Sequence, residues 1–212
     1  MKKIIKICFI ITLFSMKSIG QTGLWLKVGA EKKITKKLEI EVNLQPRFND
    51  VKEKPSSWLG EVGLKYDIFK NLNFAVYYRH IKNEKKDVYK PYHRFYGDLS
   101  YKIKKFKPIN IEYRLRYQQQ FADDDTGLTT DKNYWRNKLE MAYKNKSKFE
   151  PYISADIFYK EGYAFDQIRY KAGVEFKITK KQSIDVSYLI DDALNSNDES
   201  KSRVSLAYKI KF

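Results

Sequence analysis

The sequence predicts an all-β protein, an antiparallel up-and-down transmembrane β-barrel of about ten strands. Apolar and polar residues alternate along nearly the whole chain after residue 20, which is the period of a strand with two different faces. The alternating segments run to roughly 10–12 residues, whereas strands of soluble sheets typically have about 5–6. Because a tilted strand needs about 9–11 residues to cross a bilayer, the length favours a membrane barrel over a soluble sandwich.

The first twenty residues have the layout of a secretory signal peptide. Three lysines precede an apolar run at 7–14, and Ser18 and Gly20 provide the small residues of a cleavage site. The run is too short to span a bilayer as a helix, and it contains the only cysteine of the chain. We therefore expect a signal peptide at 1–20 and a single, thiol-free barrel domain at 21–212.

The strands are predicted in order from the alternation of apolar and polar residues. The C-terminal segment is the clearest, with Val204, Leu206 and Ile210 on one face and Ser205 and Lys209 on the other. The same period of two marks the earlier segments. The predicted strands cover residues 38–45, 61–68, 72–79, 94–103, 109–118, 135–144, 153–160, 168–178, 184–191 and 203–212.

The connections between the predicted strands alternate in length. Short, lysine-bearing turns fall at 32–37, 69–71, 104–108, 145–148 and 179–182. Longer polar loops fall at 49–57, 83–92, 121–133, 161–166 and 193–201. Outer-membrane barrels have short periplasmic turns and longer extracellular loops, so we expect the turns in the periplasm and the loops outside the cell.

The strand count depends on the segment 24–31, which also alternates and would give an eleventh strand. Single-chain bacterial barrels normally have an even number of strands, and a first strand at this position would have to begin outside the cell. We therefore predict ten strands, with residues 21–36 in the periplasm or inside the lumen, and twelve strands as the alternative.

The polar faces of the predicted strands are rich in charge and are expected to point into the barrel. The residues predicted to line the lumen are Glu112, Arg114, Arg116, Arg136, Lys138, Glu140, Arg169, Lys171 and Glu175. A ten-stranded barrel is narrow enough for side chains to fill, and enclosed charges must pair to offset their lost hydration. The lumen is therefore either plugged by an ion-pair network or a narrow, porin-like channel that prefers anions.

Aromatic residues make up 16% of the chain, and many fall near the ends of predicted strands, including Tyr66, Phe69 and Trp135. Tyr and Trp rings favour the boundary between membrane and water. We interpret these residues as membrane girdles, with ordinary packing in a soluble β protein as the alternative.

The sequence predicts no catalytic residue, no metal site and no cofactor. His80 and His93 flank the loop 83–92 near the expected outer rim, and Ser100 lies too far along the chain to pair with His93. The acidic stretch 122–127 lacks the full ligand spacing of a calcium loop. An outer-membrane lipid-modifying enzyme that uses a histidine is the first alternative function.

The formal net charge is +16, and removal of the four lysines of the signal peptide leaves about +12. Such a charge indicates an anionic partner. An exported protein rarely meets nucleic acid, so we expect outer-membrane lipid, lipopolysaccharide or an anionic solute of unknown identity. A soluble periplasmic barrel that binds an anionic ligand is the second alternative. No stretch after residue 20 is apolar for eighteen residues, which excludes a helical membrane protein.

The chain resembles a family of outer-membrane β-barrel proteins of Gram-negative bacteria that is known only as a domain of unknown function. The resemblance covers nearly the whole chain after the signal peptide. It rests on "GLWLKVGAEKKITKKLEIEV" (23–42), "IEYRLRYQQQF" (111–121), "YWRNKLEMAYKN" (134–145) and the final "YKIKF". It implies a barrel and an outer-membrane location, but no activity and no catalytic residues.

The resemblance also gives the last strand a role. In outer-membrane barrels, a final alternating strand that ends in Phe is the recognition signal for the barrel-insertion machinery. The resemblance implies this role for Tyr208, Ile210 and Phe212. The physical requirement agrees, because an open strand edge is not tolerated in lipid and the last strand must pair to close the wall.

Overall fold

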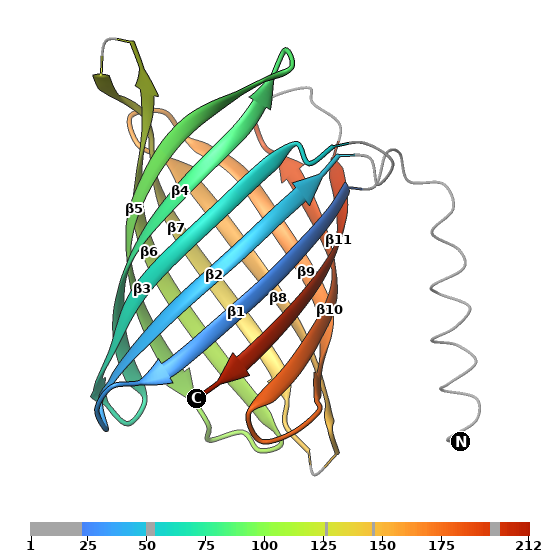
Figure 1. Ribbon diagram of the computed structural model, residues 1–212. Coiled ribbons are helices and arrows are strands. Elements are labelled where there is room, and N and C mark those ends of the chain that lie inside the picture. The colour runs from blue at the N-terminus through green and yellow to red at the C-terminus, as the bar shows by residue number, and fades with distance from the viewer. Residues whose placement is uncertain (1–22, 50–53, 126, 146, 196–199) are drawn as a thin grey trace, which may run out of the picture.

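In the computed structural model, the chain forms one closed β-barrel (Figure 1). The structure describes residues 23–49, 54–125, 127–145, 147–195 and 200–212. The predicted all-β barrel is therefore confirmed, while the signal peptide predicted at 1–20 lies outside the described residues. Within these ranges no helix is long and apolar enough to cross a membrane.

Eleven strands make up the wall, and each pairs antiparallel with the next along the chain. Every predicted strand falls within one of β2 to β11 to within one residue. The strands are β1 (Gly23–Lys33), β2 (Leu38–Phe48), β3 (Ser57–Phe69), β4 (Leu72–Lys85), β5 (Val88–Ile103), β6 (Ile109–Asp124), β7 (Gly127–Tyr143), β8 (Phe149–Lys160), β9 (Phe165–Lys177), β10 (Gln182–Ala193) and β11 (Lys201–Lys211).

The expectation that residues 21–36 lie outside the wall is wrong for β1, which is a wall strand. It pairs antiparallel with β2 and parallel with β11, from Gly23 opposite Arg203 to Glu31 opposite Lys211. When the number of up-and-down strands is odd, the first and the last strand run in the same direction. The pair that closes the barrel must therefore be parallel. Glu31 also binds Lys209 across this seam, with Oε1 2.7 Å from Nζ.

The two ends of the barrel differ. The turns 34–37, 70–71, 104–108 and 178–181, together with the end of β7 and the start of β8, lie at the end that carries the C-terminus, here named the turn end. The opposite end, named the loop end, carries the start of β1 and the other ends of the strands. In Figure 1 the turn end is at the bottom.

Two of the predicted loops, 83–92 and 121–133, are instead hairpins that continue the strands. The hairpins β4–β5 and β6–β7 project beyond the loop end (Figure 1). Lys86 and Asp87 form the first tip with φ of 51° and 64°, the left-handed backbone that a two-residue hairpin turn requires. Lys54 Nζ donates to Asp87 Oδ1 at 2.7 Å, and this bond raises the pKa of Lys54 and lowers the pKa of Asp87.

The outer surface of the barrel is apolar. Large hydrophobic side chains on it are between 40% and 60% exposed, although a water-soluble barrel would turn such residues inward. They include Val42, Leu44, Val62, Leu64, Phe74, Val76, Leu99, Leu139, Met141, Ile153, Val186 and Leu206. The pleat that turns them outward turns the charged residues between them inward.

Aromatic residues border this apolar surface. On β3, Trp58 and Tyr66 are 41% and 45% exposed on either side of Val62. Eight residues of strand span about 27 Å, which a tilt of about 40° reduces to roughly 20 Å along the barrel axis. This separation is close to the height of the apolar band of membrane barrels, about 25 Å.

Candidate functional site

The lumen contains a cavity of about 560 Å³. The charged residues that the sequence predicts for the lumen all line it, from β6, β7 and β9: Glu112, Arg114, Arg116, Arg136, Lys138, Glu140, Arg169, Lys171 and Glu175. They meet there because alternate residues of each strand point inward and the three strands curve around one interior.

More charged residues line the lumen than the nine predicted from the sequence. The inward faces of β1 to β5, β8, β10 and β11 contribute further charged side chains. Those lining the cavity include Lys27, Glu41, Glu61, Arg79, Asp98, Glu150, Asp185 and Lys209. The same alternation marks these positions, so extending the inward phase to every strand would have found them.

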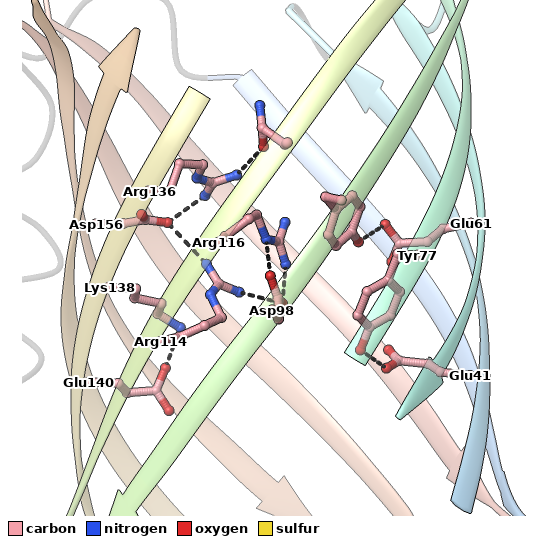
Figure 2. A network of polar contacts seen from close by, with 12 residues as sticks. Glu41, Glu61, Tyr77, Asp98, Arg114, Arg116, Arg136, Lys138, Glu140 and Asp156 are labelled. Atoms are coloured by element: carbon pink, nitrogen blue, oxygen red, sulfur yellow. Dashed lines mark hydrogen bonds and ion pairs between the residues drawn. The ribbon is translucent and has the colours of Figure 1, made fainter. Parts of the chain in front are cut away.

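One ion-pair network joins β5 to β8 (Figure 2). Arg116 pairs with Asp98 through Nε and Oδ1 at 2.6 Å. Arg114 lies between two carboxylates, with Nη1 3.8 Å from Asp98 Oδ2 and Nη2 3.3 Å from Asp156 Oδ2. Arg136 also pairs with Asp156. The network joins side chains from four strands across the interior.

A second network is centred on Glu61 of β3. Its carboxylate accepts hydrogen bonds from Arg79 Nε at 2.5 Å, from Asn43 Nδ2 at 3.0 Å and from the Tyr96 hydroxyl. Tyr77 stacks on Tyr96 with ring centroids 4.7 Å apart. Figure 2 shows Glu61, Tyr77 and Glu41 close together on one side of the lumen.

A third network lies near the closing seam. Asp191 accepts from Arg169 Nε at 2.5 Å and Nη2 at 2.9 Å, and it also pairs with Arg203. The guanidinium of Arg47 lies 3.8 Å from the centroid of the Trp25 ring, and those of Arg169 and Arg203 lie 5.2 and 5.1 Å from it. Trp25 is therefore surrounded by three cations, which its ring faces attract.

Every arginine of the sequence points into the lumen. This set, named the arginine cluster, consists of Arg47, Arg79, Arg94, Arg114, Arg116, Arg136, Arg169 and Arg203. Arginine suits buried pairs because its planar fork binds carboxylates at two points and it is weakly hydrated. Its carboxylate partners are Glu61, Asp98, Asp156 and Asp191.

The cavity ends at the arginine cluster and is closed toward the loop end. Leu59, Ile81, Tyr92 and Gln120 lie on the loop-end side of Glu61, Arg79, Arg94 and Gln118 on their own strands, and they are buried, at 2%, 3%, 7% and 2% exposure. In the other direction the lining continues to Lys144, Glu150 and Lys209 near the turn end. In the part of the chain that the structure describes, the lumen is thus a pocket that faces the turn end.

The histidines lie outside the lumen, on the outer surface near the loop end. The His80 and His93 ring centroids are 5.1 Å apart. His93 Nδ1 is 2.7 Å from the Tyr78 hydroxyl, and its Nε2 is 3.4 Å from Asp123 Oδ2. Ser100 is buried in the lumen, on the opposite face of β5 from His93, so the two do not form a pair.

No group of three or more His, Cys, Asp and Glu residues that could hold a metal ion occurs within the described ranges. The lumen carboxylates Glu61, Asp98, Asp156 and Asp191 are held in ion pairs with arginines.

Comparison with known proteins gives one informative result. No curated protein matches the chain. A protein-family model matches residues 22–202, which include β1 to β10 in full. The matched segment contains the lumen networks except for Arg203 and Lys209, which lie on β11 beyond residue 202. The chain therefore belongs to the family described as "Protein of unknown function (DUF2490)".

Proposed function

We propose that this protein is an integral outer-membrane β-barrel, exported by its signal peptide, whose charged lumen has a structural role. The observation that carries the proposal is the reversed polarity of the barrel. Leu139 and Ile153 are 43% and 60% exposed on the outside, whereas Asp98, Arg116 and Asp156 are less than 9% exposed on the inside. Lipid solvates such an outer surface, whereas water does not.

The orientation follows from the connections. The short turns and the C-terminus belong in the periplasm, and the projecting hairpins β4–β5 and β6–β7 belong outside the cell. The pocket then faces the periplasm. Outer-membrane lipid and lipopolysaccharide surround the wall, and the barrel-insertion machinery is the partner during assembly.

The closed loop end supports a structural role over an open channel. The ion pairs of Arg114, Arg116 and Arg136 link four adjacent strands at the wall of the cavity. Leu59, Ile81 and Tyr92 are buried nearer the loop end. A freely conducting pore needs a continuous aqueous path. The protein would instead be a narrow channel if the buried side chains at the loop end moved aside.

The test is electrophoresis of outer-membrane fractions with and without boiling, followed by conductance in planar bilayers. We expect a band in the outer-membrane fraction that shifts on boiling, and no steady conductance. Steady, anion-selective conductance would replace the structural role with the channel. A protein that is soluble without detergent and does not shift would overturn the membrane proposal in favour of a periplasmic ligand-binding barrel.

A lipid-modifying enzyme is the second candidate, because Asp123, His93 and Tyr78 form a hydrogen-bonded series at the outer rim. Such a series positions an imidazole for proton transfer. Mass spectrometry of lipid A from cells that carry His93→Ala or His80→Ala tests it. Lipid A that is the same as in wild-type cells would eliminate the enzyme.

A further inference from the structure

The arginine cluster has more cations than carboxylates. Its members share four acidic partners, and these serve Arg79, Arg114, Arg116, Arg136, Arg169 and Arg203. Arg47 and Arg94 have no carboxylate within 4.0 Å among the residues that the structure describes. Arg94 binds the side-chain oxygen of Gln120, with Nε 3.0 Å from Oε1. This neutral amide accepts hydrogen bonds from Nε and Nη2 of Arg94 but does not balance the charge of the guanidinium.

Among the described residues, Arg47 has a single polar contact, and it is to a neutral group. Its Nη2 donates to Gln45 Oε1 at 3.2 Å, and its Nε is buried without a hydrogen-bond partner in the described part of the chain. The guanidinium is repelled by those of Arg79, Arg94, Arg169 and Arg203. Enclosed like charges with unsatisfied donors are costly unless an anion is added.

The position is accessible from the pocket. Arg47, Arg79 and Arg169 all line the cavity of about 560 Å³, as does Trp25. A water molecule occupies about 30 Å³ of liquid, so the pocket has room for a small anion together with water. An anion that enters from the turn end therefore meets these arginines at the closed end of the pocket.

We propose that the lumen binds a phosphate-type oxyanion at Arg47, Arg79 and Arg169. Tetrahedral oxyanions match the planar fork of arginine at two points, and a divalent anion offsets the excess of positive charge in the cluster. The ligand is either a free phosphate or sulfate ion or the phosphate of a lipid head group. The inference deepens the proposed function, because it needs the folded barrel and, in the cell, a pocket supplied from the periplasm.

Trp25 provides a direct readout. The other tryptophans, Trp58 and Trp135, lie on the outer surface at 41% and 40% exposure. The double variant Trp58→Phe, Trp135→Phe leaves Trp25 as the only tryptophan of the chain. Its ring contacts the guanidinium of Arg47. The barrel is refolded in detergent and titrated with sodium phosphate, sodium sulfate or sodium chloride at constant ionic strength.

We expect a saturable change of Trp25 fluorescence with phosphate and sulfate but not with chloride. Arg47→Gln in the same background should weaken the apparent affinity at least about tenfold, because it removes a charge-assisted contact. The matched control is Lys102→Gln, which removes the same charge from the turn end, where Lys102 Nζ lies 3.4 Å from Glu112 Oε2. This control should bind phosphate as the parent does.

A response that does not saturate, or an affinity that is the same with Arg47→Gln, would overturn the proposal. Arg47→Lys is the second variant if Arg47→Gln does not refold; it keeps the charge without the fork and should also bind more weakly. A stronger response to glycerol phosphate than to inorganic phosphate assigns the ligand to a lipid head group, and the reverse assigns it to the free ion. Saturation in a protein found soluble in the periplasm would support the site while overturning the membrane proposal.

Discussion

Arg116 and Asp98 form a two-point ion pair, with Nε 2.6 Å from Oδ1 and Nη2 2.7 Å from Oδ2. The two residues lie directly opposite each other on β6 and β5, and the guanidinium also lies 3.8 Å from the centroid of the Tyr96 ring. Two guanidinium nitrogens each donate to a different carboxylate oxygen, and this bidentate geometry is stronger than a single contact. Side chains thus reinforce the backbone ladder between these strands.

Asp98→Asn tests this pair. Without the carboxylate, Arg116 becomes a buried cation with no opposite charge beside it, and we expect a loss of about 3–5 kcal/mol in unfolding free energy. Urea unfolding of the refolded barrel measures it. The control is Glu112→Gln, whose pair with Lys102 is about one-third exposed and should contribute less than about 1 kcal/mol. Equal losses would show that the buried pair adds no more stability than the exposed one.

Val62→Arg tests whether the apolar surface faces lipid. Val62 lies between Trp58 and Tyr66 on the outer face of β3, so a charge there would lie near the middle of the membrane. We expect a loss of about 2–4 kcal/mol when the protein unfolds from lipid bilayers. Phe106→Arg, at a 56% exposed site in a turn, should cost only about 0–1 kcal/mol. If Val62→Arg costs as little as Phe106→Arg, the apolar outer surface faces water and not lipid.

Gly63→Ala tests the packing of the lumen. A Cβ at Gly63 would lie 2.1 Å from the Tyr77 ring, which packs directly over this glycine on the adjacent strand. The ring must move, breaking its stacking on Tyr96 and its 3.1 Å hydrogen bond to Glu41. We expect a loss of about 1–3 kcal/mol in unfolding free energy.

Gly60→Ala is the matched control on the same strand. A Cβ at Gly60 meets nothing within 4 Å, so alanine should leave stability unchanged or raise it by up to about 1 kcal/mol through the unfolded chain. Both variants are compared by urea unfolding. A loss with Gly60→Ala as large as with Gly63→Ala would mean that the backbone, not the Tyr77 ring, sets the cost.

Phe212→Ala separates assembly from stability. Phe212 is 66% exposed, so its ring contributes little to packing, and the barrel refolded in detergent should keep its unfolding temperature. As part of the proposed insertion signal it should lower the amount of barrel in the outer-membrane fraction several-fold. Tyr163→Ala, at 77% exposure in a loop, is the control. Normal outer-membrane levels of Phe212→Ala would remove Phe212 from the signal.

The amino-acid pattern alone was enough to predict the strands and the residues on each of their two faces. Alternation in a segment such as 203–212 follows from the pleat, which turns successive side chains to opposite sides. Arg114, Arg116 and Arg136 could therefore be assigned to one face without knowledge of their neighbours. Hairpin tips were harder, because polar residues such as Lys86 and Asp87 are compatible with either a long loop or a continued strand.

The closure of the wall and the pairing of the charges could be read from the three-dimensional structure but not from the sequence pattern. Whether the segment 23–33 joins the wall depends on the register and stagger of all the other strands, which no local pattern encodes. The partners of Arg114 come from β5 and β8. The position of Arg47 beside Trp25, with no carboxylate within 4.0 Å among the described residues, depends on the same closure. Periodicity is a property of a single strand, whereas the pairing of charged side chains in the lumen depends on the closed barrel.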